Sequence, residues 1–167
     1  ALKGAAQESS VEVGFNMRNV VFDISTDTRV VVRMAEGKFL PYEKALGFTP
    51  SGFIQVDRKQ LMSALSRVSV AASNITKMCV MTLEEGSIML SSESPENGLE
   101  AMESVTLRSN TGKGVIVGFN IDFMQKCLSN MDVDSLKIGV PVNEKSPIMF
   151  YDGDVLRIQL MPLMISK

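Results

Sequence analysis

The sequence has 167 residues, of which 45% are hydrophobic and 22% are charged, enough for one domain with its own core and an appended segment. It contains no histidine, which excludes His-dependent catalytic triads and histidine metal sites. Cys79 and Cys127 lie far apart in apolar surroundings, which argues against a disulfide framework and against a zinc cluster. No apolar run reaches the roughly 18 residues that a membrane span needs. We therefore expect a cytoplasmic protein that uses no metal, cofactor or membrane.

Charge is distributed unevenly along the chain, although the net charge is only −2. The stretch from Arg29 to Lys77 holds eight basic and three acidic residues, whereas the stretch from Glu84 to Glu103 holds six acidic residues and no basic one. Such a pattern predicts either two surfaces with different partners or a charge-matched contact between copies. A solvated surface with uneven charge is the alternative.

The first third of the chain is predicted to form short strands and then a linker. Alternating β-branched residues indicate strands over Val11–Phe15, Val20–Ile24 and Arg29–Met34, and polar turn residues separate them. Residues 36–50 combine two Gly and two Pro with three aromatic residues. This mixture predicts a linker that packs on its surroundings, because an untethered linker would be rich in Gly and Ser.

A strand, a helix and three strands are predicted next. Asp57 is a candidate N-cap with Gln60 three residues later, the spacing of a capping box. The following apolar residues recur at helical spacing and form one stripe: Leu61, Ala64, Leu65, Val68 and Ala72. Strand patterns then cover Met78–Leu83, Ser87–Ser91 and Leu99–Leu107.

The same order of elements recurs about 60 residues later. A strand from Gly114 leads to Asn120 as N-cap, and the next helix carries an apolar stripe of Met124, Cys127, Leu128 and Met131. Strand patterns again follow, over Ser135–Val140, Pro147–Tyr151 and Val155–Leu160. The first fifty residues are predicted to be the end of a third copy, with the end of a helix at Ala1–Ala6.

The repeat predicts an α+β fold in which duplicated strand–helix–three-strand units pack two helices on one face of antiparallel sheets. The outward sides of these helices carry small polar groups and a few cations, as expected of a surface that touches a phosphate backbone without reading bases. An ordinary solvated helix face is the alternative. The residues predicted to face DNA are Lys59, Ser63, Ser66, Lys126 and Ser129.

Four segments in this order give the chain a family resemblance: "RMAEGKFLPYEKAL" (Arg33–Leu46), "FIQVDRKQLMSALSRVSVAASN" (Phe53–Asn74), "GFNIDFMQKCLSNM" (Gly118–Met131) and "LRIQLMPLMI" (Leu156–Ile165). They resemble the bacterial sliding clamp, the beta subunit of DNA polymerase III. The resemblance implies the DNA-clamp fold and, in a full-length chain, a ring-shaped homodimer that encircles duplex DNA and acts as a processivity factor. It also implies that residues 1–49 are the second half of a middle domain and residues 50–167 the third domain. We therefore expect this chain to be a C-terminal fragment.

The resemblance further implies an apolar cleft that binds short linear peptides of the replicative polymerase, the clamp loader and repair proteins. Methionine and leucine suit such a cleft because their deformable side chains accept varied partners. The alternative for the Met-rich C-terminal segment is plain core or strand-end packing, against which Pro162 argues. The residues assigned to the cleft are Leu40, Pro41, Lys44, Ala45, Asn120, Phe123, Gln159, Leu160, Met161, Pro162, Leu163 and Met164.

The acidic residues Glu96, Glu100 and Glu103 match an edge strand that, in the family, pairs with a basic edge of another subunit. Charges on an unpaired edge also protect against aggregation, so both interpretations predict acids at this edge.

Two other classes of function remain as alternatives. One is a non-catalytic interaction domain with a clamp-like fold that does not act on DNA. The other is an enzyme, such as a carboxylate-dependent nuclease or a cysteine hydrolase. The enzyme is disfavoured because the carboxylates of "MDVDS" and "YDGDV" lie in turn contexts and Cys127 would lack a histidine base.

Overall fold

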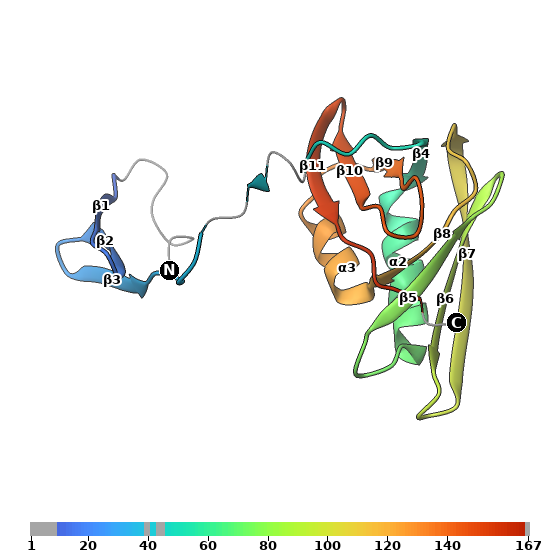
Figure 1. The fold of residues 1–167 in the computed structure, drawn as a ribbon, viewed down its shortest axis with the longest axis horizontal. Coiled ribbons are helices and arrows are strands. Elements are labelled where there is room, and N and C mark those ends of the chain that lie inside the picture. Colours follow the sequence, from blue (N-terminus) through green and yellow to red (C-terminus); the bar gives the residue numbers. More distant parts are fainter. Residues whose placement is uncertain (1–9, 39–40, 43–45, 166–167) are drawn as a thin grey trace. The chain divides into compact units, whose positions relative to one another are not determined.

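The computed structural model describes residues 10–38, 41–42 and 46–165, which form two compact units, Ala1–Pro41 and Tyr42–Lys167. Each unit has a β-sheet of its own (Figure 1). The division between them precedes the domain boundary predicted at residues 49 and 50.

The first unit is a three-stranded antiparallel sheet with the order β1-β2-β3. Its strands are β1 (Glu12–Phe15), β2 (Asn19–Ser25) and β3 (Thr28–Arg33), close to the predicted ranges. Side chains alternate between the two faces of a strand, and the register gives one apolar face and one mixed face on which Val21 and Val31 lie among polar residues. Val13, Phe22 and Val30 form one cross-strand row, and Phe15, Val20 and Val32 form the next row on the same face. Arg29 and Arg33 lie on the opposite face.

The second unit contains one antiparallel sheet with the strand order β11-β10-β9-β4-β7-β6-β5-β8. All strands and helices expected in this unit are present, with ends shifted by at most a few residues. The strands are β4 (Gly52–Asp57), β5 (Met78–Leu83), β6 (Ser87–Ser94), β7 (Leu99–Asn110), β8 (Ile116–Asn120), β9 (Ser135–Val140), β10 (Ile148–Asp152) and β11 (Val155–Leu160).

The helices α2 (Arg58–Val68) and α3 (Ile121–Ser129) begin at the two predicted caps. The Asp57 carboxylate accepts hydrogen bonds from the backbone N–H groups of Lys59 and Gln60, and the Asn120 side chain accepts one from Phe123. A side-chain acceptor at this position satisfies a backbone donor that has no partner within the helix. Neither helix is long and apolar enough to cross a membrane, within the part of the chain that the structure describes.

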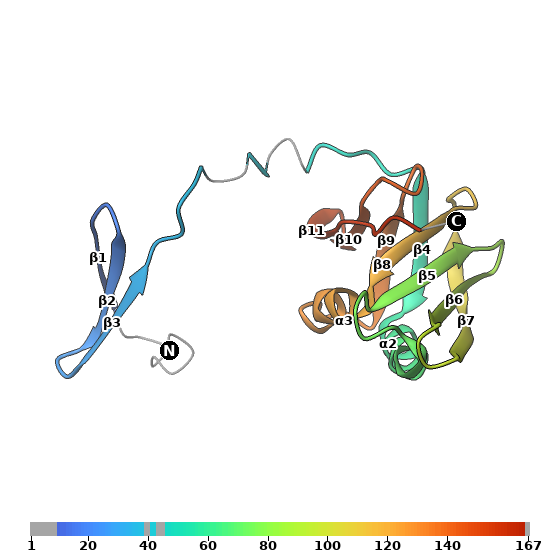
Figure 2. The same cartoon turned by 60° about the horizontal axis from the view of Figure 1, so that its bottom comes forward.

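Both helices lie side by side on one face of the sheet, as predicted (Figure 2). The apolar stripes of both helices enter one continuous core with the inward residues of the strands. Leu65, Val68 and Leu128 are fully buried there, whereas Cys127 at the edge of its stripe is half-buried. The buried apolar faces account for the stability of these short helices, since isolated helices of this length are marginal in water.

The two repeats exchange their first strands. Strand β4 opens the first repeat but pairs along its whole length with β9 of the second repeat, from Gly52 opposite Val140 to Asp57 opposite Ser135. Strand β8 opens the second repeat but pairs with β5 of the first repeat. Arg58 adds a side-chain link between the repeats, because its guanidinium donates to the carbonyl oxygens of Val133 and Leu128.

Candidate functional site

The C-terminal tail, residues 161–165, follows β11 at one end of the sheet but is hydrogen-bonded to β8 at the other end. Strand β11 ends at the buried Leu160, and the backbone N–H of Leu163 then donates to the carbonyl oxygen of Gly118 at 2.8 Å, in an antiparallel bridge. A Cβ atom at Gly118 would lie 2.9 Å from the Leu163 carbonyl oxygen and 3.0 Å from Ile165 Cγ1. The tail can therefore sit this close to β8 only because residue 118 is glycine.

This attachment brings the predicted tail residues near the start of α3, which follows β8 directly. Three large apolar side chains in this region are mostly exposed: Met161 and Met164 at 61% each and Phe123 at 55%. Pro162 and Leu163 between the two methionines are half-buried. The tail is thus held in place through its backbone while the methionine side chains stay accessible, as a surface that receives an apolar partner requires.

Asn120 has a structural task at this surface. Its Oδ1 accepts from the backbone N–H of Phe123 at 3.2 Å, and its Nδ2 donates to the carbonyl oxygen of Thr76 at 3.2 Å. The side chain therefore orients the first turn of α3, on which Phe123 sits. Gln159 differs, because its Nε2 is buried without a hydrogen-bond partner among the described residues.

The other predicted side of the cleft is described only in part. Leu40, Lys44 and Ala45 lie outside the described residues, and Pro41 is the last residue of the first unit. The assignment of these four residues stays a prediction.

The residues predicted to face DNA are all exposed on α2 and α3. Lys59 Nζ lies 3.7 Å from Asp134 Oδ1, so a nearby carboxylate partly offsets its charge. Ser66 connects the two helices, since its hydroxyl accepts from Gln125 Nε2 at 3.4 Å and donates to the Met62 carbonyl oxygen. The hydroxyl of Ser129 donates to the carbonyl oxygen of Lys126. The resulting face is polar and weakly cationic.

Strand β7 is partly an edge strand. It pairs with β6 from Leu99 to Thr106 but with β4 only through Leu107, Ser109 and Asn110. Among the strands that the structure describes, the first eight residues of β7 therefore have a free edge, and the acidic residues occur at this end. Glu100 lies on the strand, and Glu96 in the preceding turn.

Glu103 on this strand has a partner that the sequence did not reveal. Arg67 on α2 makes two hydrogen bonds to its carboxylate, Nε to Oε1 at 2.6 Å and Nη2 to Oε2 at 3.1 Å. This contact lowers the pKa of Glu103. The pKa of Glu96 is also lowered, chiefly by a hydrogen bond from the Ser73 hydroxyl.

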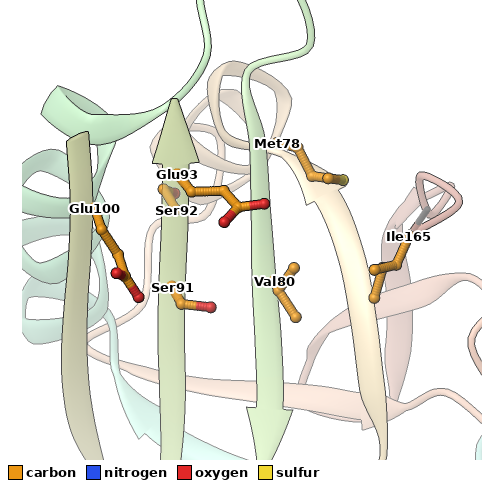
Figure 3. A pocket seen from close by; sticks show the side chains of 7 residues that line it. All are labelled: Met78, Val80, Ser91, Ser92, Glu93, Glu100 and Ile165. Carbon is orange, nitrogen blue, oxygen red and sulfur yellow. The ribbon is translucent and has the colours of Figure 1, made fainter. Parts of the chain in front are cut away.

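A hollow of about 220 Å³ lies beside the tail and was not predicted (Figure 3). Its lining combines apolar side chains from β5 and from the tail with two carboxylates, one on β6 and one on β7. The acidic stretch in the sequence indicated the two carboxylates of this hollow. The sequence alone did not show that the tail reaches these strands. The lining residues are Met78, Val80, Ser91, Ser92, Glu93, Glu100 and Ile165.

The described residues offer little for catalysis. Asp152 and Asp154 lie within 3.4 Å and 2.9 Å of Arg157 and Lys137, respectively, and no three acidic or cysteine side chains of the described chain are placed to hold a metal ion. Burial raises the pKa of the Cys79 thiol to about 11, which disfavours the nucleophilic thiolate.

Comparison with known proteins decides the family. A family model described as the DNA polymerase III beta subunit, C-terminal domain, matches residues 49–154. The chain belongs to this family. The resemblance inferred from the four sequence segments is thereby confirmed.

Relatives extend the match over most of the chain. The beta sliding clamp of Synechocystis sp. is 26% identical over 145 residues, which cover 84% of this chain and 35% of the relative. A beta-subunit crystal structure from Pseudomonas aeruginosa superposes with a TM-score of 0.81 at 21% identity, covering 96% of this chain and 44% of that one. The Thermotoga maritima beta subunit gives a TM-score of 0.76 at 25% identity, with 96% and 43% covered. The clamp fold is confirmed, and the chain spans about a third of the length of its curated relatives.

Proposed function

We propose that this chain is the peptide-binding C-terminal part of a DNA sliding clamp, a non-catalytic processivity factor of a bacterial replicative polymerase. The observation that carries the proposal is the exposed apolar group formed by Phe123, Met161 and Met164 around a tail anchored to Gly118. Short linear peptides of the polymerase, the clamp loader and repair proteins are the proposed ligands. Family membership supports the clamp over an interaction domain unrelated to DNA.

The proposal assigns DNA to the helix face. In the assembled ring, α2 and α3 face duplex DNA and contact its phosphates without reading its sequence. The small number of cations on this face, with Lys59 near Asp134, supports loose contact, because phosphate affinity grows with the number of neutralising side chains. The place of action is the cytoplasm, where the chromosome lies.

The proposal also covers assembly. Residues 1–49 are the second half of a clamp middle domain, residues 50–167 are the third domain, and Glu96, Glu100 and Glu103 mark the edge that meets another subunit in a ring. The free edge at the start of β7 supports this assignment, since an unpaired strand edge can accept a strand from another chain.

The peptide proposal is tested by titrating the whole chain into a fluorescent peptide with a polymerase-type clamp-binding motif. Detectable, weak binding is expected, and Met161→Asp is expected to reduce affinity at least about tenfold, which corresponds to roughly 1.4 kcal/mol. The matched control is Met17→Asp, since Met17 is 97% exposed in the first unit and is not assigned to the cleft. Equal affinity in the two variants contradicts the assignment of the surface.

A filter-binding assay tests the DNA proposal. At physiological salt the chain is expected to bind linear duplex DNA weakly, and this binding is expected to fall further as salt rises. Tight binding that resists salt contradicts the proposal that DNA is held by encirclement rather than by direct grip.

A further inference from the structure

The hollow beside the tail lies on the face of the sheet that is turned away from the helices. Leu90 of β6 is buried in the core on the helix side, and Glu93, three positions later, points to the opposite face because side chains alternate along a strand. Figure 3 shows Glu93 and Glu100 on one side of the hollow and Ile165 of the tail on the other. The hollow is therefore separate from the helix face that is proposed to meet DNA.

The hollow begins where the proposed peptide surface ends. Ile165 follows Met164 directly in the tail, and Met78 lies opposite Asn120 in the register of β5 and β8. Ile165 Cγ1 and Met78 Sδ lie 3.0 Å and 3.5 Å from the position that a Cβ atom at Gly118 would take. A peptide bound at the exposed methionines therefore has this hollow within reach of its flanking residues.

Two like charges lie at the hollow. Glu93 and Glu100 are directly opposite each other in the register of β6 and β7, and both are exposed. No lysine or arginine among the described residues forms an ion pair with either carboxylate. Directly opposed like charges destabilise a strand pair, so a cation supplied by a ligand would be favourable here.

The rest of the lining is largely apolar and selects the kind of cation. Val80 lies between the two carboxylates and Ile165 (Figure 3). Lysine and arginine side chains suit such a lining, because their methylene groups cover apolar surface while the charged end reaches its partner. Arginine fits best, since its planar guanidinium donates several hydrogen bonds at once to carboxylates. A metal ion would gain nothing from the apolar side chains.

The strand order sets how far this cation lies from the rest of a bound peptide. The tail is bound to β8, Glu93 lies on β6, and β5 runs between them. Neighbouring strands lie about 4.8 Å apart, so two strand spacings separate the tail from Glu93 by about 10 Å. An extended peptide advances about 3.3 Å per residue, so roughly three residues cover this distance.

We propose that the hollow binds an arginine side chain of the partner peptide, about three residues from the apolar residues that anchor the peptide on the exposed methionines. The methylene groups of the arginine cover Val80, and its guanidinium binds the carboxylates of Glu93 and Glu100. The inference rests on the proposed function, since it states which flanking residue the proposed peptide ligand carries. It concerns side chains on one face of the sheet and not the backbone edge of β7.

Fluorescence polarisation with the whole chain and a set of labelled peptides tests this preference. All peptides share one polymerase-type clamp-binding motif and differ only in a residue about three positions before or after its apolar anchor, which is arginine, glutamine or glutamate. At one of these positions the arginine peptide is expected to bind about threefold tighter than the glutamine peptide, the scale of an exposed ion pair, and the glutamate peptide more weakly than both. High salt is expected to reduce the difference, because screening weakens exposed ion pairs.

Glu93→Gln and the double variant Glu93→Gln/Glu100→Gln are expected to lose this preference, so that the arginine and glutamine peptides bind alike. The control is Glu85→Gln, which removes the same charge from an exposed site outside the hollow and is expected to keep the full preference. Circular dichroism verifies that all variants fold.

Equal affinity of the wild type for the arginine and glutamine peptides at both positions overturns the proposal. A preference that survives in the double variant also overturns it, because the cause would then be the field of the whole protein. Equal affinities would leave the proposed function intact, whereas absence of binding by every peptide would contradict the proposed function and this inference together.

Discussion

The backbone N–H of Leu163 donates to the carbonyl oxygen of Gly118. This hydrogen bond links the segment after β11, the first strand in the sheet order, to β8, the last strand. The tail leaves β11 at one end of the order and reaches β8 at the other. This attachment fixes residues 161–165 against β8. The exposed methionines owe their positions to it, which makes the contact the first target for mutation.

Gly118→Ala is expected to displace the tail, because the new methyl group would lie 2.9 Å from a backbone oxygen and 3.0 Å from an isoleucine side chain. Overpacking of this kind costs about 1–3 kcal/mol of folding free energy. We also expect a loss of peptide affinity. Chemical denaturation and peptide titration measure the two effects. Gly86→Ala is the control, since nothing lies within 4 Å of a Cβ at that position. Equal stability of the two variants contradicts the importance of the close approach.

Leu65→Ala is expected to lower the free energy of unfolding by about 2–5 kcal/mol, because it leaves a cavity in the core shared by both helices. Leu65 is 0% exposed. Ile75→Ala is the comparison, since Ile75 is 89% exposed and its truncation is expected to change stability little. Urea denaturation of both variants provides the measurement. A small loss in Leu65→Ala would show that the core is packed differently.

Acid is expected to destabilise the second unit through carboxylates whose pKa values are lowered in the folded state. The pKa of the Asp57 carboxyl is lowered from its ordinary value, chiefly because the backbone N–H of Gln60 donates to it, with a further contribution from Arg108. The stabilisation is therefore present above the unfolded-state pKa and is lost as pH falls through the lower folded-state value. Thermal melting between about pH 5 and about pH 3 is expected to show this loss.

Asp57→Asn isolates one contribution to that acid dependence. Asparagine still caps α2 but carries no charge, so the variant is expected to have a lower melting temperature at neutral pH and a shallower decline in acid. A pH profile parallel to that of the wild type would mean that the Asp57 charge does not contribute.

The two thiols are expected to differ in reactivity. Cys79 is fully buried with a pKa of about 11, whereas Cys127 is half-buried with a pKa raised by partial desolvation. At pH 8 we expect slow modification of Cys127 by an aromatic disulfide reagent and modification of Cys79 only after unfolding. Mass spectrometry of the modified peptides identifies the residue. Rapid labelling of Cys79 in the folded protein would contradict its burial.

Local signals in the sequence were sufficient for the helices and most strands. The caps at Asp57 and Asn120 and the apolar stripes depend on neighbours within a few residues, so spacing alone located them. The repeat predicted the packing of both helices on one face, and the family resemblance added the importance of the tail.

Contacts between distant residues could not be predicted in this way. The bidentate pair of Arg67 with Glu103 joins a helix to a strand, and the hollow at Glu93 and Glu100 depends on Ile165. Residue spacing carries no information on such pairs, because they are created by the order of strands in the sheet. For the same reason the acidic residues were predicted together, although within the described part of the chain Glu103 has a basic partner and Glu100 has none.

Because the two repeats exchange their first strands, the second unit cannot be divided into two independently folding halves. Each half contributes the strand that completes the sheet of the other half, and Arg58 reaches across the same boundary. Cleavage in the connection near Lys113 would therefore leave two segments that hold each other rather than two autonomous pieces. The two repeats of this unit depend on each other for folding. Neither segment is expected to refold after the other has been removed.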